Sequence, residues 1–180
     1  GHDAIMTPTS HCYLDYYQAD PTFEPKSIGG FVTLRKVYSY EPTPEELNKK
    51  EARHILGVQG NLWTEFISDP SHAEYMALPR MIALAEVAWR EKNARNWNDF
   101  QLRMRSQYLR LHKMEVNFSK GSFKVDVHTK WDPESHSMKL ILGSEQLDVP
   151  IRYTLDGNDV TDSSPVYSQP LDLNRNGVIR

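Results

Sequence analysis

Residues 55–65 read Ile-Leu-Gly-Val-Gln-Gly-Asn-Leu-Trp-Thr-Glu, an apolar run that ends in an aromatic residue and a carboxylate. Residues 55–63 predict a buried strand, and the two glycines within it leave space for close neighbours. A shorter run, Ala4-Ile5-Met6, predicts another buried strand earlier in the chain. A loop and a helical pattern follow each run, so the chain starts as a βαβα series, which implies parallel strands.

The helix after the first loop has a clear predicted start. Thr43-Pro44-Glu45-Glu46 fits a capping box, with Thr43 as the cap and Glu46 reaching back to it. That helix is expected to end near His54. Residues 31–38 fit either a short helix or an extended segment, and the sequence does not choose between them.

Two further helices are expected before residue 120. A second capping-box pattern at Ser71–Glu74 precedes apolar residues at helical spacing over 75–89, with a kink or a break into two pieces expected at Pro79. Trp89, at the end of this pattern, is interpreted as a core residue. A last helix is predicted over residues 98–113, with an apolar side and a basic face that we interpret as solvated.

Composition narrows the classes of function. The 180 residues carry a net charge of −3, so no basic excess favours nucleic-acid binding. The single Cys12 excludes an intramolecular disulfide and a paired-cysteine metal site, and the seven histidines lack metal-ligand spacing. Neither a metal nor a cofactor is therefore expected. No apolar run reaches the roughly 18 residues of a membrane-spanning helix.

The pattern of the sequence changes near residue 120, which predicts a boundary between residues 1–119 and 120–180. Beyond it, apolar residues alternate with polar ones over 123–128 and 151–156, and turn dipeptides such as Asp156-Gly157 follow. Such alternation is typical of half-buried strands in an antiparallel sheet. The fold class expected for the whole chain is α/β followed by an all-β module.

Two segments place an aromatic residue and a carboxylate two positions apart: Tyr13-Leu14-Asp15 and Trp63-Thr64-Glu65. In extended backbone this spacing directs both side chains to one side. An aromatic face beside a carboxylate suits a sugar, because the ring covers C–H patches and the carboxylate accepts from hydroxyls. The same residue types also pack in cores and cap helices. The order of elements favours a site, because in a (β/α)₈ barrel the working residues follow the carboxyl ends of the strands.

Three segments resemble family 20 β-N-acetylhexosaminidases. Residues 7–18 resemble the segment after barrel strand seven, residues 57–65 the eighth strand, and residues 79–89 the helix that closes the barrel. Residues 153–157 and 164–167 are similar to the C-terminal β-sandwich module of some of these enzymes. The resemblance implies the last two βα units of a (β/α)₈ TIM barrel, then a small, incomplete antiparallel β-sandwich of the fibronectin III type.

The resemblance also implies an activity and a role for each candidate residue. The family removes terminal N-acetylglucosamine or N-acetylgalactosamine with retention, and the acetamido oxygen of the substrate attacks to give an oxazolinium intermediate. An adjacent Asp-Glu pair orients the acetamide and transfers the proton. Tyr13 would be the catalytic tyrosine that hydrogen-bonds the acetamide oxygen. Asp15 and Glu65 would bind the outer hydroxyls of the sugar, and Trp63 would form a wall of the pocket.

The sequence departs from the family pattern because it lacks the adjacent Asp-Glu pair and is too short for a complete barrel. The 180 residues contain no Asp-Glu dipeptide, and residues 1–119 are too few for a barrel of about 250 residues. We therefore expect the C-terminal part of such an enzyme, inactive alone, with the missing N-terminal part of the barrel as its natural partner. Apolar surface that this part would cover makes self-association of the chain an expectation.

Two other functions stay open at this point. One is a non-catalytic carbohydrate-binding or interaction protein that uses Trp131, Tyr153 and Tyr167 of the β-rich region. The other is a fragment of a different TIM-barrel glycosidase. Expected partners are glycans ending in N-acetylhexosamine, with no nucleic acid, and the family's usual substrates imply a periplasmic or extracellular location.

Overall fold

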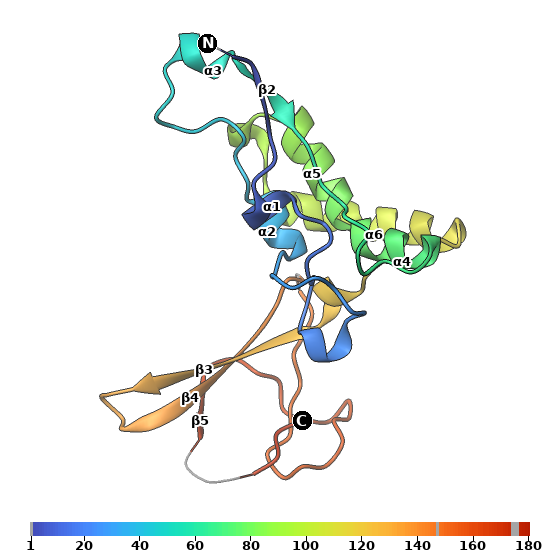
Figure 1. The fold of residues 1–180 in the computed structure, drawn as a ribbon. Coiled ribbons are helices and arrows are strands. Elements are labelled where there is room, and N and C mark those ends of the chain that lie inside the picture. The colour runs from blue at the N-terminus through green and yellow to red at the C-terminus, as the bar shows by residue number, and fades with distance from the viewer. Residues whose placement is uncertain (1, 147, 174–176) are drawn as a thin grey trace. The chain divides into compact units, whose positions relative to one another are not determined.

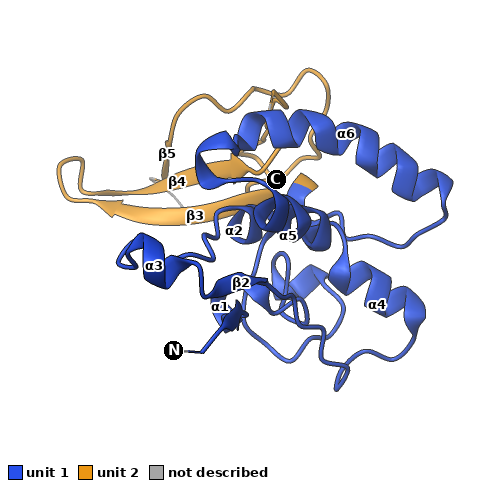
Figure 2. Ribbon diagram, turned by 90° about the horizontal axis from the view of Figure 1, so that it is seen from above, with its two compact units in different colours: residues 1–122 blue, residues 123–180 orange. Residues whose placement is uncertain are grey.

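A computed structural model describes residues 2–146, 148–173 and 177–180. The chain divides into two units, residues 1–122 and 123–180, shown in separate colours in Figure 2. The boundary predicted after residue 119 lies just before η3 (Gly121–Phe123), the short 3₁₀ helix at which the units meet in sequence. Each unit is described by itself.

The first unit contains a parallel pair of strands, β1 (Ala4–Met6) and β2 (Ile55–Val58) (Figure 1). The predicted parallel arrangement is confirmed. The predicted strand over 55–63 is too long, since β2 ends at Val58, although the chain pairs again further on at Asn61. A Cβ added at Gly60 would lie 2.8 Å from a methyl carbon of Leu84, so this glycine does admit a close neighbour.

Helices fill the rest of the first unit. Residues 31–38, undecided from the sequence, contain a short helix capped by Thr33, whose Oγ1 accepts from the Lys36 N–H at 3.2 Å. The elements of this unit, besides the strands, are α1 (Thr9–Cys12), η1 (Pro21–Phe23), α2 (Leu34–Tyr38), α3 (Lys49–Ala52), α4 (Pro70–Ala77), α5 (Arg80–Trp89), η2 (Lys92–Ala94) and α6 (Trp97–Lys113).

The helix start predicted at Thr43 is wrong. The helix begins at Lys49, and Asn48 is its cap: the Asn48 Oδ1 accepts from the Glu51 N–H at 3.1 Å. The Glu51 carboxylate accepts in return from the Asn48 N–H at 3.1 Å, which completes a capping box. Pro44 instead starts a turn, in which its carbonyl accepts from the Leu47 N–H. The local competition between two capping patterns is thus decided in favour of the later one.

The second predicted capping box is displaced by two residues. Asp69, rather than Ser71, caps α4, because its Oδ1 accepts from the His72 N–H at 2.9 Å and Pro70 occupies the first turn. Glu74, expected to complete the box, accepts instead from the Asn117 N–H at 2.9 Å. An acidic cap followed by proline therefore outcompetes a serine inside the first turn.

The break at Pro79 and the last helix are confirmed. Helix α4 ends at Ala77, α5 begins at Arg80, and the Leu78–Pro79 peptide bond between them is cis. The interpretation of Trp89 as a core residue is wrong: it is 89% exposed, at the end of α5, where the backbone becomes extended at Arg90.

The core of the first unit lies among α2, α5, α6 and the segment around α1. The Tyr38 ring stacks on Phe100 with centroids 4.5 Å apart. Aromatic packing therefore joins α2 to α6 at the centre of the unit. The buried apolar residues of the core are Cys12, Leu14, Val32, Leu34, Val37, Tyr38, Tyr40, Ala83, Leu84, Val87, Phe100, Met104 and Tyr108.

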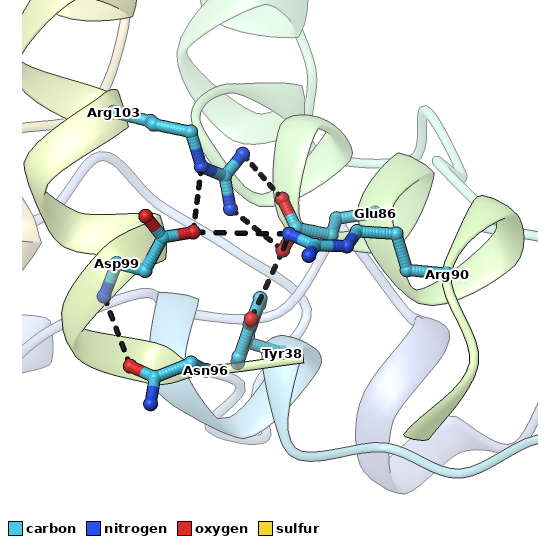
Figure 3. Close-up of polar contacts among 6 residues, drawn as sticks. All are labelled: Tyr38, Glu86, Arg90, Asn96, Asp99 and Arg103. Carbon is cyan, nitrogen blue, oxygen red and sulfur yellow. Dashed lines mark hydrogen bonds and ion pairs between the residues drawn. The ribbon is translucent and has the colours of Figure 1, made fainter. Parts of the chain in front are cut away.

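A polar network built on Glu86 adjoins this core (Figure 3). The Glu86 carboxylate is buried. Each of its oxygens lies 2.7 Å from one terminal nitrogen of Arg103, and its Oε1 also accepts from the Tyr38 hydroxyl at 3.0 Å. Arg90 approaches to 3.3 Å. Arg103 is therefore an ion-pair partner rather than part of a wholly solvated basic face. Burial disfavours the charged form of Glu86 and by itself raises the pKa. The hydrogen bonds from Arg103 and Tyr38 have the larger effect, so the pKa of Glu86 is lowered.

We expect Glu86→Gln to lower the free energy of unfolding by about 1–2 kcal/mol at pH 7, because two arginines and a buried hydroxyl lose a charged acceptor. The lowered pKa means that Glu86 stabilises the fold above the ordinary glutamate pKa, and that this contribution is lost as pH falls through the native pKa. The difference between variant and wild type should thus shrink towards pH 3 in urea denaturation. The exposed Glu91→Gln is the control. A difference independent of pH would contradict the prediction.

The described residues of the second unit form a three-stranded antiparallel sheet in the order β3 (Val125–Asp132), β4 (Ser137–Ser144), β5 (Leu171–Leu173). They contain this single sheet, so the expected two-sheet sandwich is not seen there. The strand predicted at 151–156 is wrong, since only Arg152 makes a bridge, to Val166. Val127, expected to be half-buried, is 61% exposed, and side chains on both faces of β3 are exposed.

Candidate functional site

The segment that carries Tyr13 and Asp15 runs beside the continuation of β2. After α1 the backbone becomes extended at Tyr13, which forms a parallel bridge with Asn61. The Leu14 N–H donates to the Asn61 carbonyl at 2.7 Å, and the Asn61 N–H donates to the Cys12 carbonyl at 2.8 Å. Tyr13 therefore lies level with Asn61, two residues before Trp63, so both predicted motifs occupy the same end of the strand pair.

Asp15 is the most deeply placed of the predicted site residues. It is 4% exposed, and its Oδ1 has no hydrogen-bond partner among the described residues. Burial raises the pKa of this carboxyl, with a smaller contribution from the negative charge of Glu65, while its own backbone N–H and Arg80 act in the opposite direction. A buried acceptor without a donor is rare and calls for an explanation, such as a ligand.

Asp15 and Trp63 line the same narrow recess, together with Lys26, Ser27, Ile28, Phe66, Ile67 and Met76. The recess encloses almost no free volume of its own, whereas ligand pockets typically enclose roughly 300–1,000 Å³. The recess therefore presents one part of a binding surface rather than a closed pocket. Trp63 is 52% exposed beside it, which leaves its ring available to a ligand.

The other two predicted residues stand around this recess. Glu65 is exposed and acts on Asp15 through its charge. Tyr13 is partly buried, and its ring meets the Tyr16 ring edge-on with centroids 5.5 Å apart. The structure thus brings Asp15 and Trp63 together directly, relates Glu65 to them by charge, and sets Tyr13 alongside through the bridge to Asn61.

Several residues of the site were missed by the sequence analysis. Lys26 and Phe66 line the recess, and the Lys26 ammonium lies 4.8 Å from the centre of the Phe66 ring. Ser27 donates from its hydroxyl to the Asp15 carbonyl. Arg80 is completely buried and donates to the Leu14 and Tyr16 carbonyls. The only feature of the sequence that could have marked Arg80 is its position directly after Pro79, at the start of a helix.

The described ranges contain no group of three His, Cys, Asp or Glu side chains that could hold a metal ion. None of their helices combines the length and apolar character needed to cross a membrane.

In the second unit, Trp131 lies on β3, whereas Tyr153 and Tyr167 form an edge-on pair with centroids 6.5 Å apart outside the strands. The recess of the first unit offers an aromatic ring beside a buried carboxylate, with an exposed carboxylate that acts on it by charge.

Comparisons with known proteins place both parts of the chain. Residues 1–92 match the family model "Glycosyl hydrolase family 20, catalytic domain", and residues 135–180 match "Chitobiase/beta-hexosaminidase C-terminal domain". A β-hexosaminidase of Porphyromonas gingivalis is 35% identical over an alignment of 191 positions, which covers 99% of this chain and 23% of the relative. One from Akkermansia muciniphila is 34% identical and covers 58% of this chain and 21% of the relative.

Solved structures agree with these matches. A GH20 β-N-acetylhexosaminidase from Streptomyces coelicolor is similar with a TM-score of 0.58 and 29% identity, over 66% of this chain and 24% of the other. A GH20 exo-β-N-acetylglucosaminidase from Vibrio harveyi, in complex with N-acetylglucosamine, is similar with a TM-score of 0.58 and 35% identity, over 66% and 19% of the chains. The chain spans about a quarter of the length of these relatives. On the match of its first half, the chain belongs to glycosyl hydrolase family 20.

Proposed function

We propose that this chain supplies part of the sugar-binding pocket of a retaining exo-β-N-acetylhexosaminidase. The observation that carries the proposal is the buried Asp15 carboxylate, whose Oδ1 lacks a donor among the described residues, next to the exposed ring of Trp63. A sugar supplies what this arrangement lacks: a hydroxyl for the carboxylate and a C–H face for the ring. Membership of family 20 supports the same assignment.

In this proposal each predicted residue has one task. Tyr13 donates from its hydroxyl to the acetamide oxygen of the substrate and holds that oxygen at attack distance from the anomeric carbon. Asp15 and Glu65 accept hydrogen bonds from sugar hydroxyls, and Trp63 packs against the ring. The acetamido oxygen displaces the aglycone, the oxazolinium intermediate forms, and water then opens it with retention.

We propose further that the proton-transferring residues lie outside these 180 residues. The family's adjacent Asp-Glu pair has no counterpart here, because the sequence contains no Asp-Glu dipeptide. The structure has one parallel strand pair in its described residues, whereas a (β/α)₈ barrel has eight strands. The chain would then contribute the last two βα units of the catalytic barrel and a C-terminal β-rich module, in an enzyme exported to the periplasm or beyond the cell.

Turnover of an aryl N-acetyl-β-glucosaminide tests the proposed activity. We expect the longer gene product that contains this chain to release the aryl alcohol, and the isolated 180-residue chain to release none. The galactosamine analogue, run beside it, measures the preference at the sugar. Release by the isolated chain would place the proton-transferring residue within these 180 residues and contradict the proposal that it lies outside them. A longer protein that is folded, as shown by circular dichroism, but inactive would contradict the proposed hexosaminidase activity.

A further inference from the structure

Arg80 and Ser27 hold the backbone around Asp15, one of the residues that line the recess. The Arg80 side chain is completely buried, although a guanidinium is costly to remove from water. Within the described part of the chain, it donates to four backbone carbonyls rather than to a carboxylate. The acceptors are Leu14 at 2.7 Å, Tyr16 at 3.0 Å, Val32 at 2.8 Å and Met76 at 2.6 Å.

Two of these acceptors flank Asp15 directly. Arg80 donates to the carbonyls of Leu14 and Tyr16, and Ser27 donates from its hydroxyl to the carbonyl of Asp15 between them. Three consecutive carbonyls are therefore bound by two side chains, which we call the carbonyl clamp. The Leu14 N–H is in addition bound by the Asn61 carbonyl. The backbone around Asp15 is therefore held by hydrogen bonds to its carbonyls and to one N–H.

The side chain of Asp15 contrasts with its backbone. Its main-chain carbonyl is bound by Ser27, yet its Oδ1 is buried and has no donor in the described residues. A rigid backbone beneath an unsatisfied acceptor is the arrangement that preorganisation requires, because the acceptor needs no rearrangement when a ligand's donor arrives. The planar guanidinium fork suits this task, since one rigid group can bind carbonyls of several segments at once.

We infer that the carbonyl clamp of Arg80 and Ser27 positions Asp15 for the sugar hydroxyls, so that Arg80 is a positioning residue that acts on the substrate through Asp15. This rests on the proposed function of the recess. It assigns to Arg80 a role in substrate affinity as well as in folding. It also predicts that the effects of clamp and carboxylate variants will not add, because they act through one group.

Arg80→Lys in the longer gene product is the main test. Lysine keeps the charge but cannot reproduce the fork, so we expect kcat/KM for the aryl glycoside to fall at least tenfold, mostly through a higher KM. The matched control is Arg95→Lys, another nearly buried arginine, which donates to the Tyr40 carbonyl at 2.6 Å, away from the recess. With both measured at the same folded fraction, the control should stay within twofold of wild type. Equal losses in the two variants would reduce Arg80 to a structural role and overturn the inference.

A double-mutant cycle separates the clamp from the site. After Asp15→Ala has removed the carboxylate, Arg80→Lys should cost less than threefold further; full additivity would overturn the inference. If Arg80→Lys does not fold, Ser27→Ala gives the same cycle, because it leaves the buried charge of Arg80 in place. We expect Ser27→Ala to lower kcat/KM about threefold when Asp15 is present and not at all after Asp15→Ala. If Asp15→Ala alone leaves kcat/KM unchanged, the proposed role of the recess fails, and the clamp inference with it.

Discussion

Tyr13→Phe is expected to lower kcat of the longer gene product about 10²- to 10³-fold towards an aryl N-acetyl-β-glucosaminide. The change removes one hydroxyl and keeps the ring, whose edge-on contact with Tyr16 at 5.5 Å is therefore preserved. In the proposed mechanism this hydroxyl holds the acetamide oxygen at attack distance from the anomeric carbon. Loss of one such preorganised donor typically costs about two to three powers of ten in rate.

The division between kcat and KM tests the role assigned to Tyr13. A hydrogen bond that strengthens in the transition state affects kcat, whereas one formed equally with bound substrate affects KM. Tyr153→Phe, which removes a hydroxyl in the second unit, is the control and should leave both constants within twofold of wild type. A Tyr13→Phe enzyme with unchanged kcat and raised KM would show that Tyr13 serves only in binding.

Phe100→Ala is expected to cost about 3–5 kcal/mol in the free energy of unfolding of the 180-residue chain. The Phe100 side chain is 1% exposed and stacks on Tyr38 at 4.5 Å, with Trp97 at 5.6 Å on the same helix. Truncation removes aromatic contacts from both neighbours and leaves a cavity between α2 and α6. Because domains are stable by only about 5–15 kcal/mol, the variant should be largely unfolded at modest urea concentrations.

Urea denaturation followed by tryptophan fluorescence and by circular dichroism measures this loss. Leu109→Ala is the matched control, because Leu109 lies on the same helix but is 64% exposed, and its truncation should change stability by less than about 1 kcal/mol. Similar midpoints for the two variants would show that the packing of α6 on α2 contributes little to the stability of the first unit.

Local chemistry explains which elements could be predicted from the sequence. Pro79 has no N–H to continue a helix, so α4 and α5 separate there whatever the rest of the molecule does. Apolar periodicity likewise predicts α6, whose Phe100 and Met104 are buried. Where two local patterns compete, as Thr43 and Asn48 do for a helix start, the pattern at Thr43 led to a wrong prediction.

The site was predictable in part for the same reason. The spacing of two selects two pairs of residues, and one member of each pair, Asp15 and Trp63, lines the recess. The extended backbone assumed for both pairs is wrong, because Asp15 and Glu65 lie in turns. Lys26 reaches that recess from a loop with no periodic pattern. Arg80 lies 66 residues from Leu14 and 64 from Tyr16, and its acceptors are backbone carbonyls, which every residue type possesses. No side-chain pattern in the sequence marks such partners.

The position of Arg80 limits how this part of the molecule can be recombined. The guanidinium follows β2, whereas the carbonyls of Leu14, Tyr16 and Val32 follow β1. The donor of these hydrogen bonds therefore lies in the segment after β2, and their acceptors lie in the segment after β1. A chimaera that exchanged one of these segments with a distant relative would have to preserve the backbone path of the other. The segments that follow β1 and β2 are consequently best engineered together.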